Sequence, residues 1–280
     1  MFDRLRARAA CRSFDYQWAE IPQGDFLLSD AGFADHVDSI LSEEELQIGR
    51  EWFKGRRVLD AGCGQGRWIE GFLRLGCEVT AIDASAAAVA QNQERYGDRI
   101  RAMEADVLRA DELFPGEKFD LVFSWGVLHH TRDAAAGVKA LSRLVADDGL
   151  LYLYLYGPLA GTKKESRRLN IRRLGYNLLP LRARHRLMER RYGPGQAHAM
   201  FDLLSTPLNK RYSLDDAKKM LTDAGMTRTT VTIPHTELFL RSDRGSSSAD
   251  PFFLPQPEPP YWFERLAEQA AARDAETAPA

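Results

Sequence analysis

The sequence predicts an α/β fold in which helices cover both faces of a mostly parallel β-sheet. Between residues 58 and 156, short apolar runs typical of buried strands alternate with segments of helical periodicity. This alternation implies parallel strands joined by right-handed helical crossovers. The first apolar run ends in Asp60, and three glycines spaced G-x-G-x-G follow it at 62, 64 and 66. Glycines there let the backbone approach a ligand closely, which predicts a nucleotide-like cofactor site.

Length and composition place the chain among ordinary globular proteins. Its 280 residues fit one large domain with appendages, and 28% of them are charged. The net charge of -2 offers no global attraction to nucleic acid or to anionic lipid. The three cysteines are an odd number without metal-ligand spacing, so we expect reduced thiols and no metal site. We find neither a signal-like segment nor an apolar run of roughly 20 residues, and we expect a soluble, cytoplasmic enzyme.

Residues 1–57 are expected to form a helical N-terminal cap. The pattern Ser-Glu-Glu-Glu at 42–45 is typical of a capping box at the start of a helix. The apolar side of that helix would carry Leu46, Ile48, Trp52 and Phe53.

Residues 58–156 are expected to form the cofactor-binding core, which residues 213–244 complete. The second strand spans residues 78–83, and Ser85 is the expected N-cap of a helix that runs to Tyr96. The other core elements follow the same alternation, with these expected ranges: a third strand ending at 104–107, a fourth strand at 119–124, a helix at 134–145, a fifth strand at 150–156, a helix at 213–225, and β-rich runs at 227–233 and 237–241.

Residues 157–212 interrupt the core with a basic helical insertion, expected to act as a substrate lid. Between residues 163 and 191, eleven Lys or Arg stand against two acids, with leucines interleaved at helical spacing. This local excess predicts contact with an anionic acceptor, since Arg bonds phosphate in a bidentate way. The leucines would also permit shallow contact with a membrane surface, though not a membrane span. The alternative is a solvated amphipathic helix pair.

Residues 245–280 are expected to form a flexible linker and a C-terminal helix. The Gly-Ser-rich run at 245–248 and the Pro-rich run at 251–260 are typical of linkers. An amphipathic helix over 261–273 would follow, and it could dock on the core or stay mobile.

The glycine turn does not fit a dinucleotide site, because G-x-G-x-x-G places a small residue where this chain has Arg67. The sequence Val-Leu-Asp-Ala-Gly-Cys-Gly at 58–64 resembles instead the first motif of class I S-adenosylmethionine-dependent methyltransferases, and the resemblance continues through the fifth strand. It implies a Rossmann-like sheet of seven strands, mostly parallel with an antiparallel last strand, and a helical insertion after strand five. It also implies S-adenosylmethionine as cofactor and S-adenosylhomocysteine as product.

The segment Phe14-Asp15-Tyr16-Gln17-Trp18 resembles an F-x-Y-Q-W signature that some bacterial members of this superfamily carry before the core. There the signature lines or lids the cofactor, so the resemblance implies cofactor contacts for Tyr16 and Trp18. Asp15 replaces the more usual glycine. Alternatively, Phe14 and Trp18, spaced i and i+4, form the apolar side of a helix.

Acidic residues at the strand ends are the expected polar contacts of the cofactor. By resemblance, Asp60 accepts a hydrogen bond from the cationic amino-acid part; alternatively it is tied to the glycine-turn amides. Asp83, followed by Ala84, suits the ribose because a carboxylate offers two acceptors to two hydroxyl donors. Asp106 resembles the residue that accepts from the adenine amine, with Val107 or Leu108 against the ring. The alternative for Asp106 is a solvated acid at a helix start.

The backbone at Gly62, Gly64 and Gly66 is expected to lie against the cofactor. Ser124 and Trp125, at the carboxyl end of strand four, are expected beside its methionine part. Trp125 could instead belong to the core.

His129 and His130 follow strand four, and family members with the same Leu-His-His run can use one histidine as general base. Histidine suits this role because its ordinary pKa lies near neutrality. The alternative is that a histidine only packs the end of the strand. Tyr16, Tyr156 and His235 are the next candidates for the base.

The expected activity is methyl transfer to an oxygen or nitrogen of a small molecule, such as a secondary metabolite, a sugar or a glycolipid precursor. One alternative is methylation of RNA or another macromolecule. The (N/D)PP(Y/F) tetrapeptide of base N-methylation is replaced by Ser-Trp-Gly-Val at 124–127, so a nucleic-acid partner is disfavoured. The other alternative is an S-adenosylmethionine-binding protein without methyl transfer. The pattern carries no prediction of oligomeric state.

Overall fold

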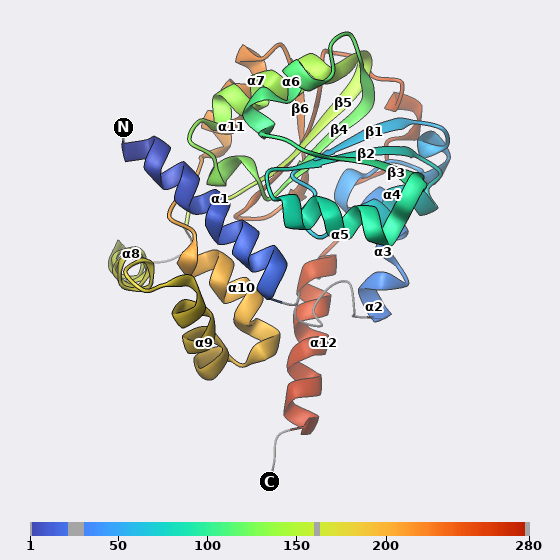
Figure 1. Ribbon diagram of the computed structural model, residues 1–280. Coiled ribbons are helices and arrows are strands. Elements are labelled where there is room, and N and C mark those ends of the chain that lie inside the picture. Colours follow the sequence, from blue (N-terminus) through green and yellow to red (C-terminus); the bar gives the residue numbers. More distant parts are fainter. Residues whose placement is uncertain (1, 22–30, 160–162, 278–280) are drawn as a thin grey trace.

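A computed structural model describes residues 2–21, 31–159 and 163–277, and a seven-stranded sheet lies at its centre (Figure 1). The strand order is β3-β2-β1-β4-β5-β7-β6. Strands β1 to β5 pair in parallel, whereas β7 runs antiparallel to both of its neighbours. The predicted Rossmann-like sheet with an antiparallel last strand is therefore confirmed. The strands span Arg57–Ala61 (β1), Glu78–Asp83 (β2), Ile100–Glu104 (β3), Phe119–Trp125 (β4), Val145–Leu155 (β5), Arg228–Pro234 (β6) and Leu238–Asp243 (β7).

Helices cover both faces of the sheet, and each face has its own apolar core (Figure 1). One core packs around Trp68 and Phe72, beneath α4, the short α2 and α3, and the start of α12. The other packs around Val138 and Leu141, beneath α6, α7 and α11. The helices of these layers span Ala31–Ala34 (α2), Val37–Ser39 (α3), Ile69–Arg74 (α4), Ala86–Tyr96 (α5), Ala110–Leu113 (α6), Ala134–Leu144 (α7), Leu214–Asp223 (α11) and Trp262–Thr277 (α12).

Two of the predicted helix starts are present with their caps. The Ser85 side chain accepts from the Ala88 N–H at the start of α5, and Ser213 forms a capping box with Asp216 at the start of α11. Strand β5 begins five residues before the predicted Leu150, because Val145 already pairs with Phe119 across a register shift.

The capping box predicted at residues 42–45 is wrong. Ser42 lies inside a π-helix, η1 (Ile40–Leu46), where its hydroxyl donates to the Asp38 carbonyl, and a short 3₁₀ helix, η2 (Arg50–Phe53), follows. The physical reason is that Glu45 does not turn back toward a cap. Its fully buried carboxylate accepts from the Trp125 indole (2.7 Å), the Tyr152 hydroxyl (2.8 Å) and the Trp262 indole (2.8 Å).

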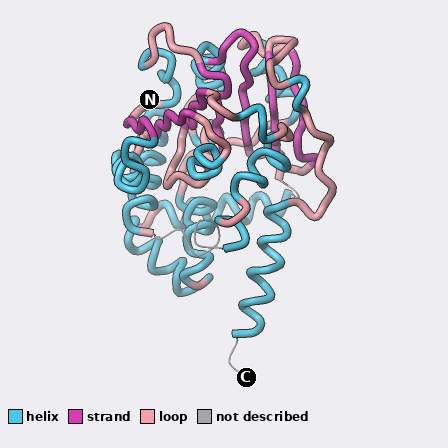
Figure 2. The backbone as a smooth tube through the Cα atoms, turned by 90° about the vertical axis from the view of Figure 1, so that its right-hand side faces the viewer, coloured by secondary structure: helices cyan, strands magenta, loops and turns pink. Residues whose placement is uncertain are grey.

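The N-terminal helix and the insertion form one helical layer beside the sheet (Figures 1 and 2). Its helices are α1 (Phe2–Glu20), α8 (Lys163–Asn177), α9 (Leu181–Tyr192) and α10 (Pro194–Ser205). Ile21, Met188, Phe201 and Leu204 build a third apolar core inside this layer. Residues 22–30 of the expected cap and 160–162 of the expected insertion lie outside the described residues.

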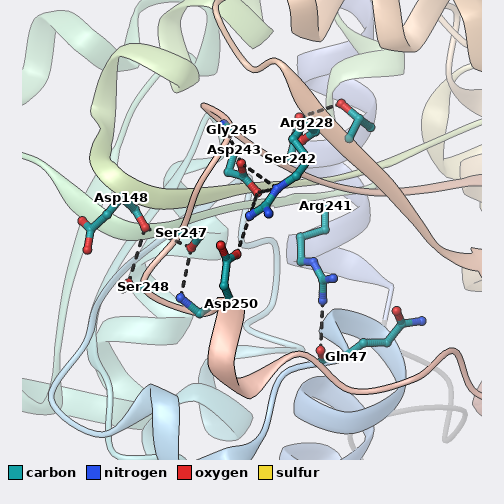
Figure 3. A network of polar contacts seen from close by, with 12 residues as sticks. Gln47, Asp148, Arg228, Arg241, Ser242, Asp243, Gly245, Ser247, Ser248 and Asp250 are labelled. Atoms are coloured by element: carbon teal, nitrogen blue, oxygen red, sulfur yellow. Dashed lines mark hydrogen bonds and ion pairs between the residues drawn. The ribbon is translucent and has the colours of Figure 1, made fainter.

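The segment after β7 makes contacts that do not fit a flexible linker (Figure 3). The Ser247 hydroxyl and the Ser248 amide both donate to the Asp148 carbonyl. Arg228 pairs with Asp243 and also with Asp250 of the short 3₁₀ helix η6 (Asp250–Phe252). Beyond it, Trp262 enters the core and reaches Glu45. The Gly, Ser and Pro content of this segment suggested a linker. In the structure these residues form turns that contacts with distant segments hold in place.

Across the parts of the chain described above, none of the helices combines the length and the apolar character that a membrane crossing requires.

The buried Glu45 should make the free energy of unfolding depend on pH. Burial raises its pKa from 4.5 to about 7, so the folded protein binds the extra proton between these values. Stability should therefore fall as pH rises from about 4.5 to about 7, by about 3 kcal/mol from this group. Urea denaturation of Glu45→Gln at several pH values should lack this contribution. Glu43→Gln, an exposed neighbour on η1, should keep the wild-type slope; identical slopes in all three proteins would contradict the prediction.

Candidate functional site

The glycine turn between β1 and α4 is shaped by a backbone that only glycine adopts readily. Gly62, Gly64 and Gly66 have φ values of 89°, 50° and 83°. The amides of Gly62 and Cys63 both donate to the Ile82 carbonyl, which joins the turn to the end of β2. A Cβ at Gly62 would lie 2.2 Å from the Val127 Cγ2 atom, so this position has no room for a side chain.

Asp83, at the carboxyl end of β2, is the carboxylate that holds the turn. Its Oδ2 accepts from the Gly64 amide and its Oδ1 from the Ser85 amide, each at 2.9 Å. Burial raises the pKa of Asp83, while these amides act in the opposite direction. Each oxygen keeps a further lone pair, so the carboxylate can still accept from two ligand hydroxyls.

Asp60 lies at the end of β1 with buried and unused hydrogen-bonding capacity. Its Oδ2 atom is buried and has no hydrogen-bond partner among the described residues, so the alternative that Asp60 serves the glycine-turn amides does not hold for this oxygen. Burial, together with the charge of Asp83, raises the pKa of Asp60 to about 8, and nearby Arg67 opposes this rise. A cationic ligand group would supply the missing donor.

Arg67 follows the turn and carries the complementary unused group. Its guanidinium lies 4.5 Å from the Trp125 ring centroid, and its Nε atom is buried without a partner among the described residues. Burial lowers the pKa of Arg67 to about 10, so it stays cationic at neutral pH. One unpaired acceptor and one unpaired cationic donor therefore flank the glycine turn. This pair fits the ammonium and carboxylate of an amino-acid group, as the methionine part of S-adenosylmethionine carries them.

Helix α1 covers the glycine turn. The side-chain amides of Gln65 and Gln91 donate to the Trp18 carbonyl at 3.0 and 2.9 Å. The Trp18 ring lies so close that a Cβ at Gly64 would be 3.1 Å from its Cζ2 atom. The Ser85 hydroxyl donates to Asp15 of α1 at 2.7 Å. Trp18 thus lies against the glycine turn, and its contact with a cofactor stays a prediction.

Tyr16 lies on another side of α1, and its placement does not fit the predicted cofactor contact or a role as base. Its hydroxyl lies 3.3 Å from the His185 Nδ1 atom, and its ring packs against Phe201. Because residues two apart on a helix face nearly opposite directions, Trp18 can meet the turn only if Tyr16 meets the insertion.

The remaining predicted contacts divide between the site and the scaffold. The Ser124 hydroxyl is buried and donates to the Ala61 carbonyl at 2.9 Å, joining β4 to β1. Asp106 is exposed and caps the 3₁₀ helix η4 (Val107–Arg109), which agrees with the alternative of a solvated acid at a helix start. Val107 is buried in the core. Ala84 is exposed beside Asp83. Trp125 is half-buried, bonded to Glu45 and stacked on Tyr154 at 4.3 Å between ring centroids.

His129 and His130, on the 3₁₀ helix η5 (Leu128–His130), differ in what their nitrogens do. His129 is fully buried and stacks on Tyr156 at 3.7 Å between ring centroids. Its Nδ1 accepts from the Tyr156 amide at 3.3 Å, so its neutral ring carries the proton on Nε2. Burial and the neighbouring His130 hold the pKa of His129 well below its usual value. With its lone pair engaged, His129 is poorly placed to accept a proton.

His130 has the opposite arrangement. Its Nδ1 lies 2.8 Å from the Leu208 carbonyl oxygen, which can only accept, so Nδ1 carries the proton and Nε2 has a lone pair. That Nε2 lies 3.6 Å from the Asp202 Oδ1 atom. Burial lowers the pKa of His130 and the charge of Asp202 opposes the shift, so the ring is neutral at neutral pH. A neutral imidazole with a free lone pair beside a carboxylate can accept a proton and hold the resulting cation.

Sequence reasoning missed Asp202, which comes from α10 of the insertion. Its Oδ2 atom also accepts from the Tyr156 hydroxyl at 3.1 Å. Arg173 of α8 and Arg211 lie on the same side, where they donate to the carbonyls of Thr206 and Gly157. No local spacing marks Asp202, because its partners are Tyr156, just after β5, and His130 of η5, both far away in the chain. His235, a further candidate base, is exposed in the turn between β6 and β7.

Known proteins resemble this chain over its core. Residues 59–151 match the family model described as a methyltransferase domain. The ubiquinone biosynthesis O-methyltransferase of Rhodopseudomonas palustris (strain TIE-1) is 33% identical over 98 residues, which are 35% of this chain and 39% of that protein. The enzyme of the same name from Alkalilimnicola ehrlichii is 38% identical over 104 residues, 34% of this chain and 40% of that protein. An uncharacterised Synechococcus protein is 38% identical over 120 residues, 27% of its length. The chain thus spans less than half the length of these curated relatives.

Solved structures extend the likeness of the fold beyond the core. An O-methyltransferase family protein from Burkholderia thailandensis aligns over 77% of this chain and 56% of that one, with a TM-score of 0.52 and 17% identity. A chain from the complex of the Haloferax volcanii Trm112 methyltransferase activator with a putative methyltransferase aligns over 82% of this chain and 97% of that one, with a TM-score of 0.53 and 15% identity. At these identities the likeness concerns the fold alone.

Gly62→Ala should destabilise the protein more than Gly116→Ala. Both glycines have similar positive φ values, 89° and 79°, so both variants incur backbone strain of about 1–2 kcal/mol. A methyl group at Gly116 meets nothing within 4 Å, whereas at Gly62 it overlaps Val127, which adds about 1–3 kcal/mol. Urea denaturation of the two variants measures the difference. Equal losses of stability in the two variants would show that the glycine turn accommodates a methyl group at residue 62 without added cost.

Proposed function

We propose, starting from the membership of this chain in the class I S-adenosylmethionine-dependent methyltransferases, that it transfers a methyl group to an oxygen or a nitrogen of a small-molecule acceptor. The observation that carries the proposal is the pairing of the glycine turn and Asp83 with a histidine that has a free lone pair at the same edge of the sheet. The O-methyltransferase names of the matched relatives favour an acceptor hydroxyl.

The cofactor would be held from three sides. Asp83 would accept from the ribose hydroxyls with the lone pairs that the Gly64 and Ser85 amides leave free. Asp60 would accept from the ammonium group, and Arg67 would donate to the carboxylate. S-adenosylmethionine, when bound, supplies a methyl group that its sulfonium has already activated. The protein's task is then to exclude water, as α1 does over the turn, and to orient the acceptor.

His130 would remove the acceptor proton. Its Nε2 lone pair accepts the proton, and Asp202, at 3.6 Å, stabilises the imidazolium that results. The Leu208 carbonyl fixes the tautomer by accepting from Nδ1. In this proposal Asp202 is a positioning residue, which acts through His130 and through the Tyr156 hydroxyl.

Aromatic rings suggest the class of acceptor. Trp125, Tyr154 and Tyr156 follow one another beside His130 at the ends of β4 and β5, and each ring centroid lies within 6.0 Å of a neighbouring one. Such surfaces suit an acceptor with a flat or apolar body that carries a hydroxyl. Arg173 and Arg211 on the same side suit an acceptor that is also anionic.

Asp83→Ala should weaken the binding of S-adenosylhomocysteine by about 1–3 kcal/mol, because two buried donors would lose their acceptor. Titration calorimetry measures this, with Asp98→Ala, an exposed acid on η3 (Gly97–Arg99), as the control. Neither variant nor the wild type should bind NAD, since Arg67 occupies the position where dinucleotide sites need a small residue. Wild-type affinity in Asp83→Ala would refute the ribose assignment.

His130→Ala should lower turnover by about 10²–10⁴-fold, the typical loss when a general base is removed. Asp202→Asn should also lower turnover, because it removes the charge that stabilises protonated His130. The substrate would be a hydroxylated acceptor found by screening for S-adenosylhomocysteine release. Affinity for S-adenosylhomocysteine should stay unchanged in both variants. Because burial lowers the pKa of His130, its neutral form persists as pH falls below 6.5, so wild-type kcat should stay level there and fall only at lower pH.

Tyr16→Phe is the matched control for these variants. It removes a hydroxyl that lies against His185 inside the helical layer, so turnover should be retained. Loss of turnover equal to that of His130→Ala would show that Tyr16 belongs to the catalytic site.

The acceptor class has its own test, in which S-adenosylmethionine with a labelled methyl group is the donor. Label that appears in RNA, rather than in a small-molecule fraction, would overturn the proposed class of acceptor.

A further inference from the structure

Exposed apolar side chains gather in the insertion. Over the described residues, seven large apolar side chains are exposed, and five of them lie between residues 171 and 187. The three most exposed are Leu178 (79%), Leu174 (67%) and Ile171 (61%), followed in this segment by Leu187 (42%) and Leu179 (37%). Scattered single apolar residues on a surface are ordinary, but a local cluster marks a surface that meets something apolar.

The cluster has a helical geometry. Ile171, Leu174 and Leu178 are spaced i, i+3 and i+7 along α8 and the turn after it, so they lie on one side. The opposite side of α8 faces the protein: Leu169 and Tyr176 pack against the core of the helical layer, and the Arg173 guanidinium donates to the Thr206 carbonyl. The outer side of α8 and the turn after it thus present three exposed aliphatic side chains, while the inner side anchors the helix.

Arginines surround this apolar side. Arg167, Arg168 and Arg172 are exposed on α8, within or beside the apolar stripe. On α9, further exposed arginines flank Leu187, at positions 182, 186, 190 and 191. The only exposed acid among the described side chains of α8 and α9 is Glu189, which pairs with His185. Since the whole chain has a net charge of -2, this concentration of cations is a property of one surface.

We propose that the outer side of α8, with the turn after it and the arginines of α9, docks on the surface of an anionic lipid bilayer. The aliphatic side chains would enter the boundary between headgroups and acyl chains, and the arginines would bond lipid phosphates. An RNA would engage the arginines but would leave Ile171, Leu174 and Leu178 in water. A second copy of this chain would bring two cationic surfaces together. Of these three partners, only an anionic bilayer complements both the cations and the exposed aliphatic side chains.

Docking at this surface would place the bilayer next to the candidate site. Arg173, on the inner side of α8, acts electrostatically on His130, and Asp202 on α10 lies on the same side. The charge of Arg173 thus links the helix proposed to meet the bilayer to the candidate site. The docking inference does not rest on methyl transfer, and vesicle binding can succeed or fail independently of any activity.

Vesicle co-sedimentation of the full chain tests the inference. The wild type should sediment with vesicles of phosphatidylcholine and phosphatidylglycerol, and not with phosphatidylcholine alone. Binding should weaken between 0.1 M and 1 M NaCl, as the screening length falls from about 10 Å to about 3 Å. Arg167→Gln/Arg168→Gln/Arg172→Gln should reduce the partition coefficient by tenfold or more, since each basic residue contributes about 1 kcal/mol near an anionic surface.

Two controls separate the cationic and apolar contributions. Arg99→Gln/Lys139→Gln/Lys218→Gln removes the same charge from exposed positions elsewhere and should bind as the wild type does. Ile171→Ser/Leu174→Ser should lose binding, whereas Leu113→Ser, an exposed leucine on α6, should not. Circular dichroism and thermal melts confirm the fold of each variant.

Equal binding of both arginine triples would overturn the proposal, as would equal binding to both kinds of vesicle. Two further results would replace the bilayer by another partner. Light scattering that shows a dimer in the wild type and a monomer in Ile171→Ser/Leu174→Ser would assign the stripe to a second copy. RNA that binds with the same dependence on Arg167, Arg168 and Arg172, while vesicles do not bind, would assign the cations to nucleic acid.

Discussion

The buried carboxylate of Glu45 is the interaction on which the arrangement of this molecule depends most. Three donors converge on it, from Trp125 of β4, Tyr152 of β5 and Trp262 of α12, so it joins the N-terminal segment, the sheet and the C-terminal helix. A carboxylate in such a place is costly unless it is fully hydrogen-bonded or protonated. This carboxylate lies on the π-helix that precedes β1, and there it points into the core. The same carboxylate accepts from the Trp125 indole, and the Arg67 guanidinium lies over the ring of this tryptophan.

The helical layer of α1 and the insertion has a second role, because it completes a site that the sheet only begins. The sheet supplies the glycine turn, Asp83 and the histidines of η5, as expected where parallel strands end. The insertion adds Asp202 beside His130, and α1 adds Trp18 beside the turn. Two segments from opposite ends of the core therefore meet over the same edge of the sheet. A movement of the layer would change the cover of the cofactor site and the partner of His130 together.

Helix α8 also separates two kinds of arginine that composition cannot distinguish. Arg173 is partly buried and bonded to a backbone carbonyl near the site, whereas Arg167, Arg168 and Arg172 face outward. On α9, Arg184 is likewise engaged with Asn177 and Ser205. The basic character of the insertion is thus divided between cations that hold the layer together and cations that remain available to a partner.

The resemblance to a known family implied the class of cofactor. The sequence by itself determined the succession of strands and helices in the core and the glycine turn. These features are encoded in local patterns: apolar periodicity, glycines at positions of positive φ, and caps such as Ser85 and Ser213. Tertiary structure alone decided which histidine has a free lone pair, that Tyr16 faces the insertion, and that Glu45 is buried. It also decided that the Ser- and Pro-rich segment after β7 is held against the core. The physical reason is that hydrogen bonds between distant segments, such as the approach of Asp202 to His130, depend on how layers pack, and no local periodicity records that packing.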